Sequence, residues 1–219
     1  LCQQIECGTY FFNQIAFPPA DTDLAFTRVP GQPDEAIFYF SQTITPGDSV
    51  PPGGFVTLEG GNGDDILSGS LFNNLLIGNR GNDDFRTRGG FDTVQGGGGS
   101  DTLSIYENNG GSDSFYSVNL GSGIFREGGF TTMLFDVENV VGSDGRSAFL
   151  FGDSGINRLV GGSGPDLLVG EAGRDNLLGR DGDDILVGGA SGDSQIGGDG
   201  NDVLVAGASP ANRQPDVYD

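Results

Sequence analysis

Aspartates recur among glycines at a fixed spacing, and this spacing is the feature of the sequence that could do chemistry. From Gly60 the chain divides into nine-residue segments with the consensus G-G-x-G-x-D-x-U-x, where U is a large apolar residue. One uninterrupted run begins at Gly60, Gly69, Gly78, Thr87 and Gly96, and a second begins at Gly152, Gly161, Gly170, Gly179, Gly188 and Gly197. Carboxylates and backbone carbonyls are the hard oxygen ligands that Ca²⁺ takes, about six to eight at a time. The spacing therefore favours calcium chemistry.

Each repeat position suggests a structural role that would place those oxygens. We expect glycines at positions 1, 2 and 4 to adopt positive φ and to turn their carbonyls inward. Positions 7 to 9 predict a short strand whose position 8 faces the interior. That interior row reads Leu67, Leu76, Phe85, Val94, Leu103, Leu159, Leu168, Leu177, Leu186, Gln195 and Leu204, and only Gln195 is polar. A degenerate segment, GSDGRSAFL from Gly142, precedes the second run with one extra residue, Phe151.

The nonapeptide pattern resembles the RTX, or haemolysin-type, calcium-binding repeat family. The resemblance covers about half of the chain by strict repeats and roughly three quarters if the degenerate middle is included. It implies an all-β chain folded as a right-handed parallel β-roll, a solenoid in which two nonapeptides form one coil. Loops on one edge are then 18 residues apart, with each Ca²⁺ between two such loops.

Seven loop pairs follow from that arrangement as candidate calcium sites. Four keep the turn pattern nearly complete, namely the pairs that begin at 60/78, 78/96, 161/179 and 179/197. The pairs 152/170 and 170/188 are weakened by Asn157 and Ser191, and the pair 69/87 is poor because Phe72 and Asn74 replace consensus residues. The candidate ligands are Gly60, Asn62, Gly63, Asp65, Gly78, Arg80, Asp83, Asp92, Gly96, Gly98, Asp101, Gly161, Ser163, Asp166, Gly170, Asp175, Gly179, Asp181, Gly182, Asp184, Asp193, Gly197, Asp199 and Asp202.

The non-repeat segments divide the chain further. We interpret residues 1–52 as a non-repeat, β-rich N-terminal cap, because a solenoid must cover its open end; a partner-binding segment is the alternative. Residues 53–104 form the first repeat block and 152–205 the second, with 206–219 as a tail. For residues 105–151 we expect irregular coils that continue the same solenoid, with strands at Phe115–Leu120 and Met133–Val141.

One face of the second block is unusually apolar. Positions 7 and 9 should point outward, and there they read Leu167, Val169, Ile185, Val187, Val203 and Val205. The face that we take as its equivalent in the first block reads Ile66, Ser68, Asp84, Arg86, Thr102 and Ser104 and is mostly polar. Contiguous apolar surface usually marks an interface. The open alternatives are a self-association or protein-docking face, a simple preference of valine for strands, and a face covered by residues 105–151.

Composition narrows the classes of function. The 219 residues carry a net charge of −21 and include 41 glycines but no His, Lys or Trp. This charge disfavours nucleic-acid binding, and no apolar run is long enough to span a membrane. A catalytic triad that needs His is impossible, so we expect no enzyme activity. Cys2 and Cys7 either form a local disulfide or remain free thiols.

These features predict an extracellular or cell-surface calcium-binding structural or assembly protein that folds on binding Ca²⁺. The alternative is a calcium-folded module of a larger secreted enzyme or toxin.

Overall fold

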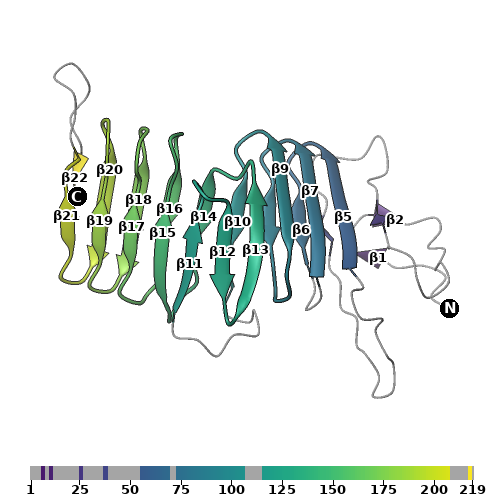
Figure 1. Cartoon of the computed structure of the whole chain (residues 1–219), viewed down its shortest axis with the longest axis horizontal. Coiled ribbons are helices and arrows are strands. Elements are labelled where there is room, and N and C mark those ends of the chain that lie inside the picture. The colour runs from purple at the N-terminus through teal and green to yellow at the C-terminus, as the bar shows by residue number, and fades with distance from the viewer. Residues whose placement is uncertain are drawn as a thin grey trace.

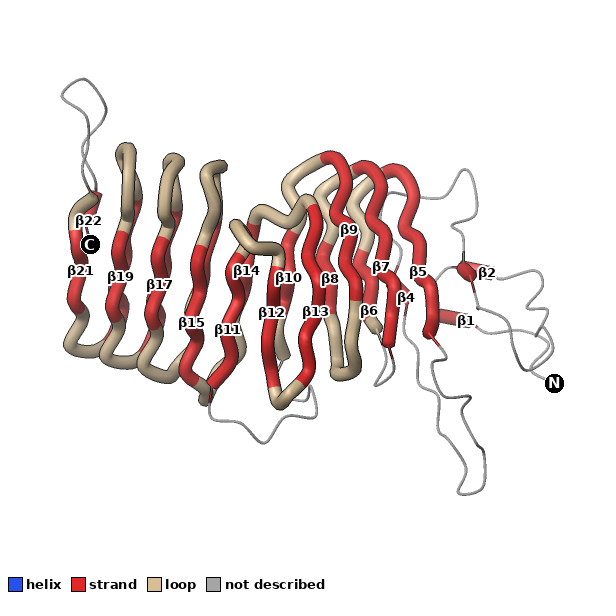
Figure 2. Tube along the Cα trace, in the orientation of Figure 1, coloured by secondary structure: helices blue, strands red, loops and turns tan. Residues whose placement is uncertain are grey.

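The computed structural model describes residues 6–7, 10–11, 25–26, 37–38, 55–69, 73–106, 115–207 and 217–218. Every regular element within these residues is a strand, as Figure 2 shows. The described part of the chain thus offers no helix that could cross a lipid bilayer. The prediction of an all-β chain is confirmed.

The chain winds as a solenoid in which successive coils stack along the long axis of the molecule (Figure 1). Within the repeat blocks, each coil contributes one strand to each of two sheets. The first sheet, sheet B, has the order β21-β19-β17-β15-β11-β12-β13-β9-β7-β5-β3. The second sheet, sheet C, has the order β22-β20-β18-β16-β14-β10-β8-β6-β4. Sheet B contains β3 (Ala25–Phe26), β5 (Phe55–Asn62), β7 (Asn73–Arg80), β9 (Thr93–Gly98), β11 (Phe115–Asn119), β12 (Ile124–Glu127), β13 (Phe130–Phe135), β15 (Ser147–Phe151), β17 (Leu167–Val169), β19 (Ile185–Val187) and β21 (Val203–Val205).

Sheet C lies on the opposite side of the interior. It contains β4 (Ile37–Phe38), β6 (Ile66–Ser68), β8 (Asp84–Arg86), β10 (Thr102–Ser104), β14 (Asn139–Val141), β16 (Arg158–Val160), β18 (Asn176–Asp181), β20 (Ser194–Asp199) and β22 (Val217–Tyr218). Within both repeat blocks the strands pair in parallel with an offset of one coil, for example Leu67 with Phe85 and Leu168 with Leu186.

The position-8 side chains fill the space between the sheets, as predicted. From Leu67 to Leu186 every apolar member of the row is fully buried. Gln195 is fully buried as well, and its amide N–H donates to the Val205 carbonyl at 3.1 Å. The row continues through the middle of the chain, where Leu134 pairs with Val94 and Val140 pairs with both Leu103 and Leu159. One apolar core therefore runs through both blocks.

The middle segment continues the solenoid, but not with parallel coils alone. Strands β11, β12 and β13 pair antiparallel with one another inside sheet B, between β9 and β15 (Figure 1). The predicted strand at 115–120 is β11, whereas the predicted stretch at 133–141 divides into β13 and β14 on opposite sheets. The antiparallel strands pair within the sheet, so they do not cover the apolar face of the second block.

Two expectations about register are wrong. The inward residue of β15 is Leu150, which pairs with Leu168, while Phe149 points outward. The extra residue of this segment therefore lies in the turn before β15, and is not Phe151. The two faces compared between the blocks also belong to different sheets, because β6, β8 and β10 are in sheet C and β17, β19 and β21 are in sheet B. The inserted antiparallel strands shift which repeats of the two blocks share a sheet.

Four short strands fall within the predicted N-terminal cap. Strands β1 (Glu6–Cys7) and β2 (Tyr10–Phe11) pair with each other in antiparallel fashion. Strand β3 pairs with β5 in parallel, and β4 pairs with β6. These two strands extend both sheets past the first repeat, at the end that a cap would cover. The other residues of 1–52 and the tail beyond 207, except β22, lie outside the described residues.

Candidate metal sites

The turns that join the two sheets form two rows, one along each edge of the solenoid. Turns from sheet B to sheet C form edge one, which contains loops 60–65, 78–83, 96–101, 152–157, 170–175 and 188–193, with the turn 136–138 between the blocks. Turns from sheet C to sheet B form edge two, which contains the connection from β6 to β7 and loops 87–92, 142–148, 161–166, 179–184 and 197–202. Every predicted loop pair therefore stacks on one edge.

The position-6 side chains form a hydrogen-bonded ladder along each edge. The backbone N–H of Asp65 donates to Oδ1 of Asp83, and that of Asp83 donates to Oδ1 of Asp101, both at 2.8 Å. The second block repeats the bond from Asp166 to Asp184 at 2.8 Å and from Asp175 to Asp193 at 2.9 Å. These side chains are buried. One carboxylate oxygen of each thus serves the coil that precedes it.

The other carboxylate oxygen faces the turn of its own loop. In Asp83, Asp92, Asp101, Asp175 and Asp184 this Oδ2 is buried and accepts no hydrogen bond within the described residues. In several loops it lies beside the position-1 carbonyl of the next coil: a Cβ built on Gly179 would overlap Oδ2 of Asp184 and approach the Gly197 carbonyl oxygen to 2.5 Å. Two buried oxygens that converge without a donor fit a cation, because an unpaired buried charge is costly.

The position-1 glycines have a different role from the predicted one. Positive φ occurs at position 2, as in Gly97 (104°) and Gly198 (108°), and at position 4, as in Gly81 (124°) and Gly182 (128°), but not at position 1. Instead, position 1 needs glycine for space, since a Cβ there would collide with the position-6 carboxylate in the same loop. This glycine therefore keeps the pocket open.

Burial makes these carboxyls unusually weak acids when no cation is bound. Desolvation raises the pKa of Asp101, Asp175 and Asp184 to about 6 and that of Asp92 to about 7, and hydrogen bonds from the preceding coil oppose the shift only in part. Neighbouring acids raise the pKa further in several loops, as Asp166 and Asp202 do for Asp184. A divalent cation relieves both effects.

The predicted position-3 ligands present their side chains to solvent. The side chains of Asn62, Arg80, Ser163, Asp181 and Asp199 are exposed. Their loops offer backbone at this position, and the carbonyls of Arg80, Gly98 and Asp199 accept hydrogen bonds of 2.7 to 2.9 Å from the position-4 N–H of the preceding coil. Position 3 therefore holds the coils together through its backbone.

In two loops of the second block, a backbone N–H of the loop already donates to the position-6 side chain of the same loop; we call these loops closed. The N–H of Gly162 donates to Oδ2 of Asp166 at 2.7 Å, and the N–H of Asp153 donates to Oδ1 of Asn157 at 2.8 Å. Neither Gly162 nor Asp153 has the positive φ that position 2 shows in most of the other repeat loops. The sequence ranks the pair 161/179 among the strongest, whereas the structure gives its first loop a carboxylate that is already bonded.

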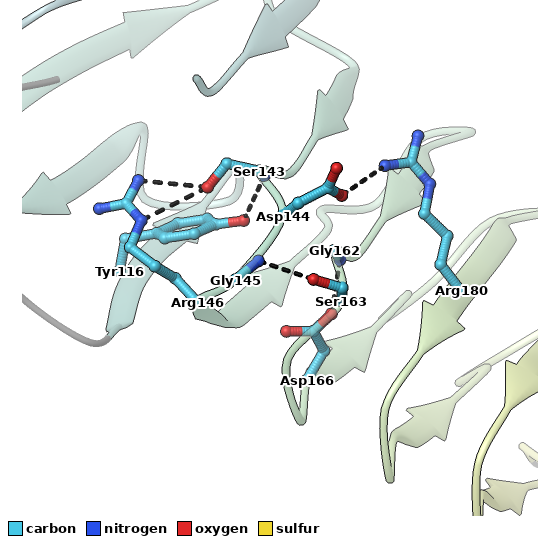
Figure 3. Close-up of polar contacts among 9 residues, drawn as sticks. All are labelled: Tyr116, Ser143, Asp144, Gly145, Arg146, Gly162, Ser163, Asp166 and Arg180. Atoms are coloured by element: carbon cyan, nitrogen blue, oxygen red, sulfur yellow. Dashed lines mark hydrogen bonds and ion pairs between the residues drawn. The ribbon is translucent and has the colours of Figure 1, made fainter. Parts of the chain in front are cut away.

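The turn 142–148 carries a protein cation, Arg146 (Figure 3). Its position 6 is Ala148, and the Tyr116 hydroxyl lies against Gly142, where a carboxylate oxygen lies in other loops. The Arg146 guanidinium lies 4.8 Å from the centre of the Tyr116 ring, donates to Ser143 Oγ and forms an ion pair with the buried Glu127. Sequence reasoning recognised the degenerate segment from Gly142 but missed the roles of Arg146 and Tyr116, because neither residue occupies a consensus position.

The poor pair 69/87 differs again. Asp92 Oδ1 accepts the Asn74 N–H at 2.7 Å, but the strand that follows its coil is β13, whose hairpin supplies no repeat loop. Across the described residues no group of three or more acidic, His or Cys side chains could hold a metal by side chains alone. The sites that the edges offer therefore combine carboxylates with backbone carbonyls, as the chemistry of Ca²⁺ allows.

Comparison with known proteins agrees with this geometry. The family described as the RTX calcium-binding nonapeptide repeat (4 copies) matches residues 53–76, 59–94, 77–104, 151–186 and 178–209. These matches cover half of the chain and leave the segment between the two blocks unmatched. No curated protein matches the chain.

Proposed function

The chain belongs to the RTX calcium-binding nonapeptide repeat family, and from that premise we propose that it is an extracellular or cell-surface structural or assembly protein that folds on binding Ca²⁺. The proposal has two parts. The first is that calcium binding and folding are one event in this chain. The second is that the folded solenoid acts as a scaffold and not as a catalyst.

The first part rests on the buried Oδ2 atoms along the two edges. In Asp83 and Asp184 this oxygen faces a carbonyl of the next coil, at Gly96 and Gly197 respectively, with no donor between them in the described structure. Stacking two such coils without a cation would bury like charges together. A ligand that binds the folded chain and not the unfolded chain stabilises the fold. When calcium is bound, it supplies the positive charge that the stacked loops lack.

The number of ions follows from the loop pairs. The sequence offers seven pairs, and the structure favours 60/78, 78/96, 170/188 and 179/197, whose position-6 residues are aspartates and whose loops adopt positive φ at positions 2 and 4. Loops 152–157 and 161–166 are closed by their own N–H groups, so we rank the pairs that begin with them lower. We propose seven ions as the upper limit for the repeats.

Circular dichroism tests the coupling directly. In excess chelator at neutral pH the β-sheet signal should be largely absent, and titration with Ca²⁺ should restore it steeply, because neighbouring sites share loops. Mg²⁺ at the same concentration should not, since it demands a tight octahedral shell. An unchanged β-sheet signal in chelator would contradict the proposal that calcium binding and folding are one event.

A scaffold is one of two roles that fit such folding. A calcium-folded module of a larger secreted enzyme or toxin would show the same titration. The intact mass of the protein isolated from its native source distinguishes the two, since a mass far above 22.7 kDa would assign the module role. We assign no catalytic residue, because the acidic side chains at the edges are explained by cation binding.

The outward face of sheet B supports an assembly role. Ile185, Val203 and Val205 remain between 42% and 53% exposed. The face continues onto the middle segment, where the exposed rings of Phe115 and Phe149 pack edge to face at 5.9 Å between centres. Contiguous exposed apolar surface is uncommon on monomers unless it is used. We propose that this face, which includes Leu167, Val169 and Val187, mediates self-association.

A further inference from the structure

The junction between the two repeat blocks has an unusual turn on edge one. Loop 96–101 is followed on this edge by the turn 136–138, which joins β13 to β14. Strand pairing aligns Phe135 with Gln95 and Asn139 with Thr102. Three residues, Asp136, Val137 and Glu138, therefore span the gap that six residues span in a repeat loop. The family match does not include this segment.

Glu138 nevertheless makes the bond of a repeat aspartate. The backbone N–H of Asp101 donates to Oε2 of Glu138 at 2.8 Å, the length of the bond from Asp83 to Asp101 one coil earlier. In return, the Glu138 N–H and the Asn139 N–H donate to the Asp101 carbonyl at 3.2 and 2.9 Å. A glutamate is one methylene longer than an aspartate, which lets the side chain reach the same N–H from a shorter turn.

Two oxygens converge in this junction without a donor. A Cβ built on Gly96 would overlap the Asp136 carbonyl oxygen and lie 2.5 Å from Oδ2 of Asp101. The Asp101 side chain is fully buried, and its Oδ2 accepts no hydrogen bond within the described residues. Asp136 holds a left-handed conformation, with φ of 51°, which is uncommon for a non-glycine residue. The strained backbone of Asp136 thus places its carbonyl beside the buried carboxylate of Asp101.

We propose that this junction, between loop 96–101 and the turn 136–138, binds a calcium ion that lies outside the repeats, with Asp101 Oδ2, the Asp136 carbonyl and Glu138 as its ligands. The inference rests on the proposed calcium-dependent function and adds a site to it. The ion replaces the contact that a repeat loop would otherwise make, and it joins the first block to the second.

On the side of the turn 136–138 that faces loop 152–157, the neighbouring side chain is the neutral amide of Asn157. The Asn157 amide N–H donates to the Glu138 carbonyl at 2.9 Å, and its Oδ1 accepts the Asp153 N–H. These bonds satisfy the Asn157 amide on both atoms without a cation. The row of ions that begins in the first block therefore extends one step past Asp101 and is interrupted at Asn157, before the pair 170/188 of the second block.

Native mass spectrometry of the full chain with saturating Ca²⁺ tests the site by counting ions. Glu138→Gln keeps an oxygen to accept the Asp101 N–H but removes the charge. We expect it to bind one ion fewer than the unmodified chain while it still folds with calcium. Asp144→Asn is the matched control, because Asp144 is an exposed acid of the same segment that lies on edge two, and it should keep the full count.

A crystal structure of the calcium-loaded chain gives a second measurement that needs no variant. Anomalous scattering should show an ion in contact with Asp101 Oδ2 and the Asp136 carbonyl. An equal ion count for the Glu138 variant and the unmodified chain, or an ion-free junction in a crystal whose repeat loops are loaded, would overturn the inference and leave the proposed function intact. Failure of the unmodified chain to bind calcium at all would instead overturn the proposed function.

Discussion

The backbone N–H of Asp83 donates a 2.8 Å hydrogen bond to Oδ1 of Asp101, the residue at the same repeat position one coil later. Because of this bond, the two carboxylate oxygens of each such aspartate have different roles. Oδ1 fixes the preceding coil, and Oδ2 is left for the turn of its own loop. The same carboxylate therefore sets the spacing of the coils and supplies charge to a site, so its two roles can be separated by substitution.

Alanine at position 1 should block a site through volume alone. Gly96→Ala would place a Cβ against the Asp136 carbonyl and Asp101 Oδ2, whereas Gly98→Ala in the same loop meets only the Asn79 carbonyl oxygen at 3.9 Å. Neither glycine has positive φ, so backbone strain does not separate them. We expect Gly96→Ala to raise the calcium midpoint of folding several-fold and Gly98→Ala to leave it within error. Similar midpoints in a calcium titration by circular dichroism would contradict the assigned role of position 1.

The calcium-free chain should become more stable in mild acid. Burial raises the pKa of Asp101, Asp175 and Asp184 to about 6 and that of Asp92 to about 7, from an ordinary 3.8. Carboxyls with a raised pKa bind more protons in the folded chain than in the unfolded chain. Stability therefore grows as the pH falls from about 7 towards 3.8 and is lost as the pH rises through 6 to 7. In chelator, the β-sheet signal should be greater at pH 5 than at pH 8.

The same linkage predicts competition between protons and calcium. Ca²⁺ binds the ionised carboxylates, so its midpoint should shift to higher concentration as the pH falls, and protons should be released on binding. Titration in a weakly buffered solution with a pH electrode measures that release. A calcium midpoint that does not change between pH 7.5 and 5.5 would show that these carboxyls do not titrate at the sites.

Aspartates that belong to at least one favoured loop pair should matter more than Asp92. Asp83 belongs to the pairs 60/78 and 78/96, and Asp184 to 161/179 and 179/197. Asp92 has no following repeat loop on its edge, because β13 comes next. Each filled site adds about 1.4 kcal/mol at ten times its Kd. Replacement of Asp83 or Asp184 by Ala should raise the calcium midpoint far more than Asp92→Ala, and three equal midpoints would contradict this ranking.

The turn 142–148 should contribute to stability without calcium. Arg146→Met would leave the buried Glu127 carboxylate unpaired and remove the guanidinium from the Tyr116 ring. Loss of one partner of a buried ion pair costs about 3 kcal/mol or more. At saturating calcium we expect a lower Tm with an unchanged ion count, and the double variant with Glu127→Gln should recover part of the loss. The exposed Arg158→Gln serves as control, and a fall in ion count for Arg146→Met would assign calcium to this turn.

The repeat pattern predicts the parts of this fold that depend on periodicity. The buried row from Leu67 to Leu186 and the offset of one coil between paired strands follow from a spacing of nine. The pattern does not distinguish a glycine that needs positive φ from one that needs an absent side chain, because both are written as Gly. That is why position 1 is explained wrongly from sequence, although its residue type is recognised.

The continuation of the solenoid through residues 105–151 was predicted, but the contacts within this segment were not, because they depend on residues outside the repeat consensus. Glu138 acts from a turn three residues shorter than a repeat loop, and Arg146 takes a cationic role that the consensus gives to no side chain. The antiparallel strand β12 also shifts which repeats share a sheet. The sequence signal for this site is Glu138, a charged residue in a turn shorter than a repeat loop. This signal can be recognised only after the strand register is known.

The outward face of sheet B gives the last prediction. Burial of apolar surface contributes roughly 25 cal/mol per Å² to stability. A contact that covers Ile185, Val203 and Val205 is therefore favourable. On sheet C the corresponding positions of β8 carry Asp84 and Arg86, which form a 2.7 Å ion pair across one strand. The double substitution Ile185→Asp and Val187→Arg copies that pair onto β19, on the outward face and away from the position-6 carboxylates.

This variant should still fold with calcium, since Leu186 between the two positions keeps its place in the core. At saturating calcium, sedimentation velocity should show the unmodified chain as an oligomer and the variant as a monomer. The matched control introduces the same pair on the outward face of sheet C, as Ser194→Asp and Ile196→Arg, and should remain an oligomer. A monomeric unmodified chain would end the self-association proposal, and a control that dissociates as well would place the contact on sheet C.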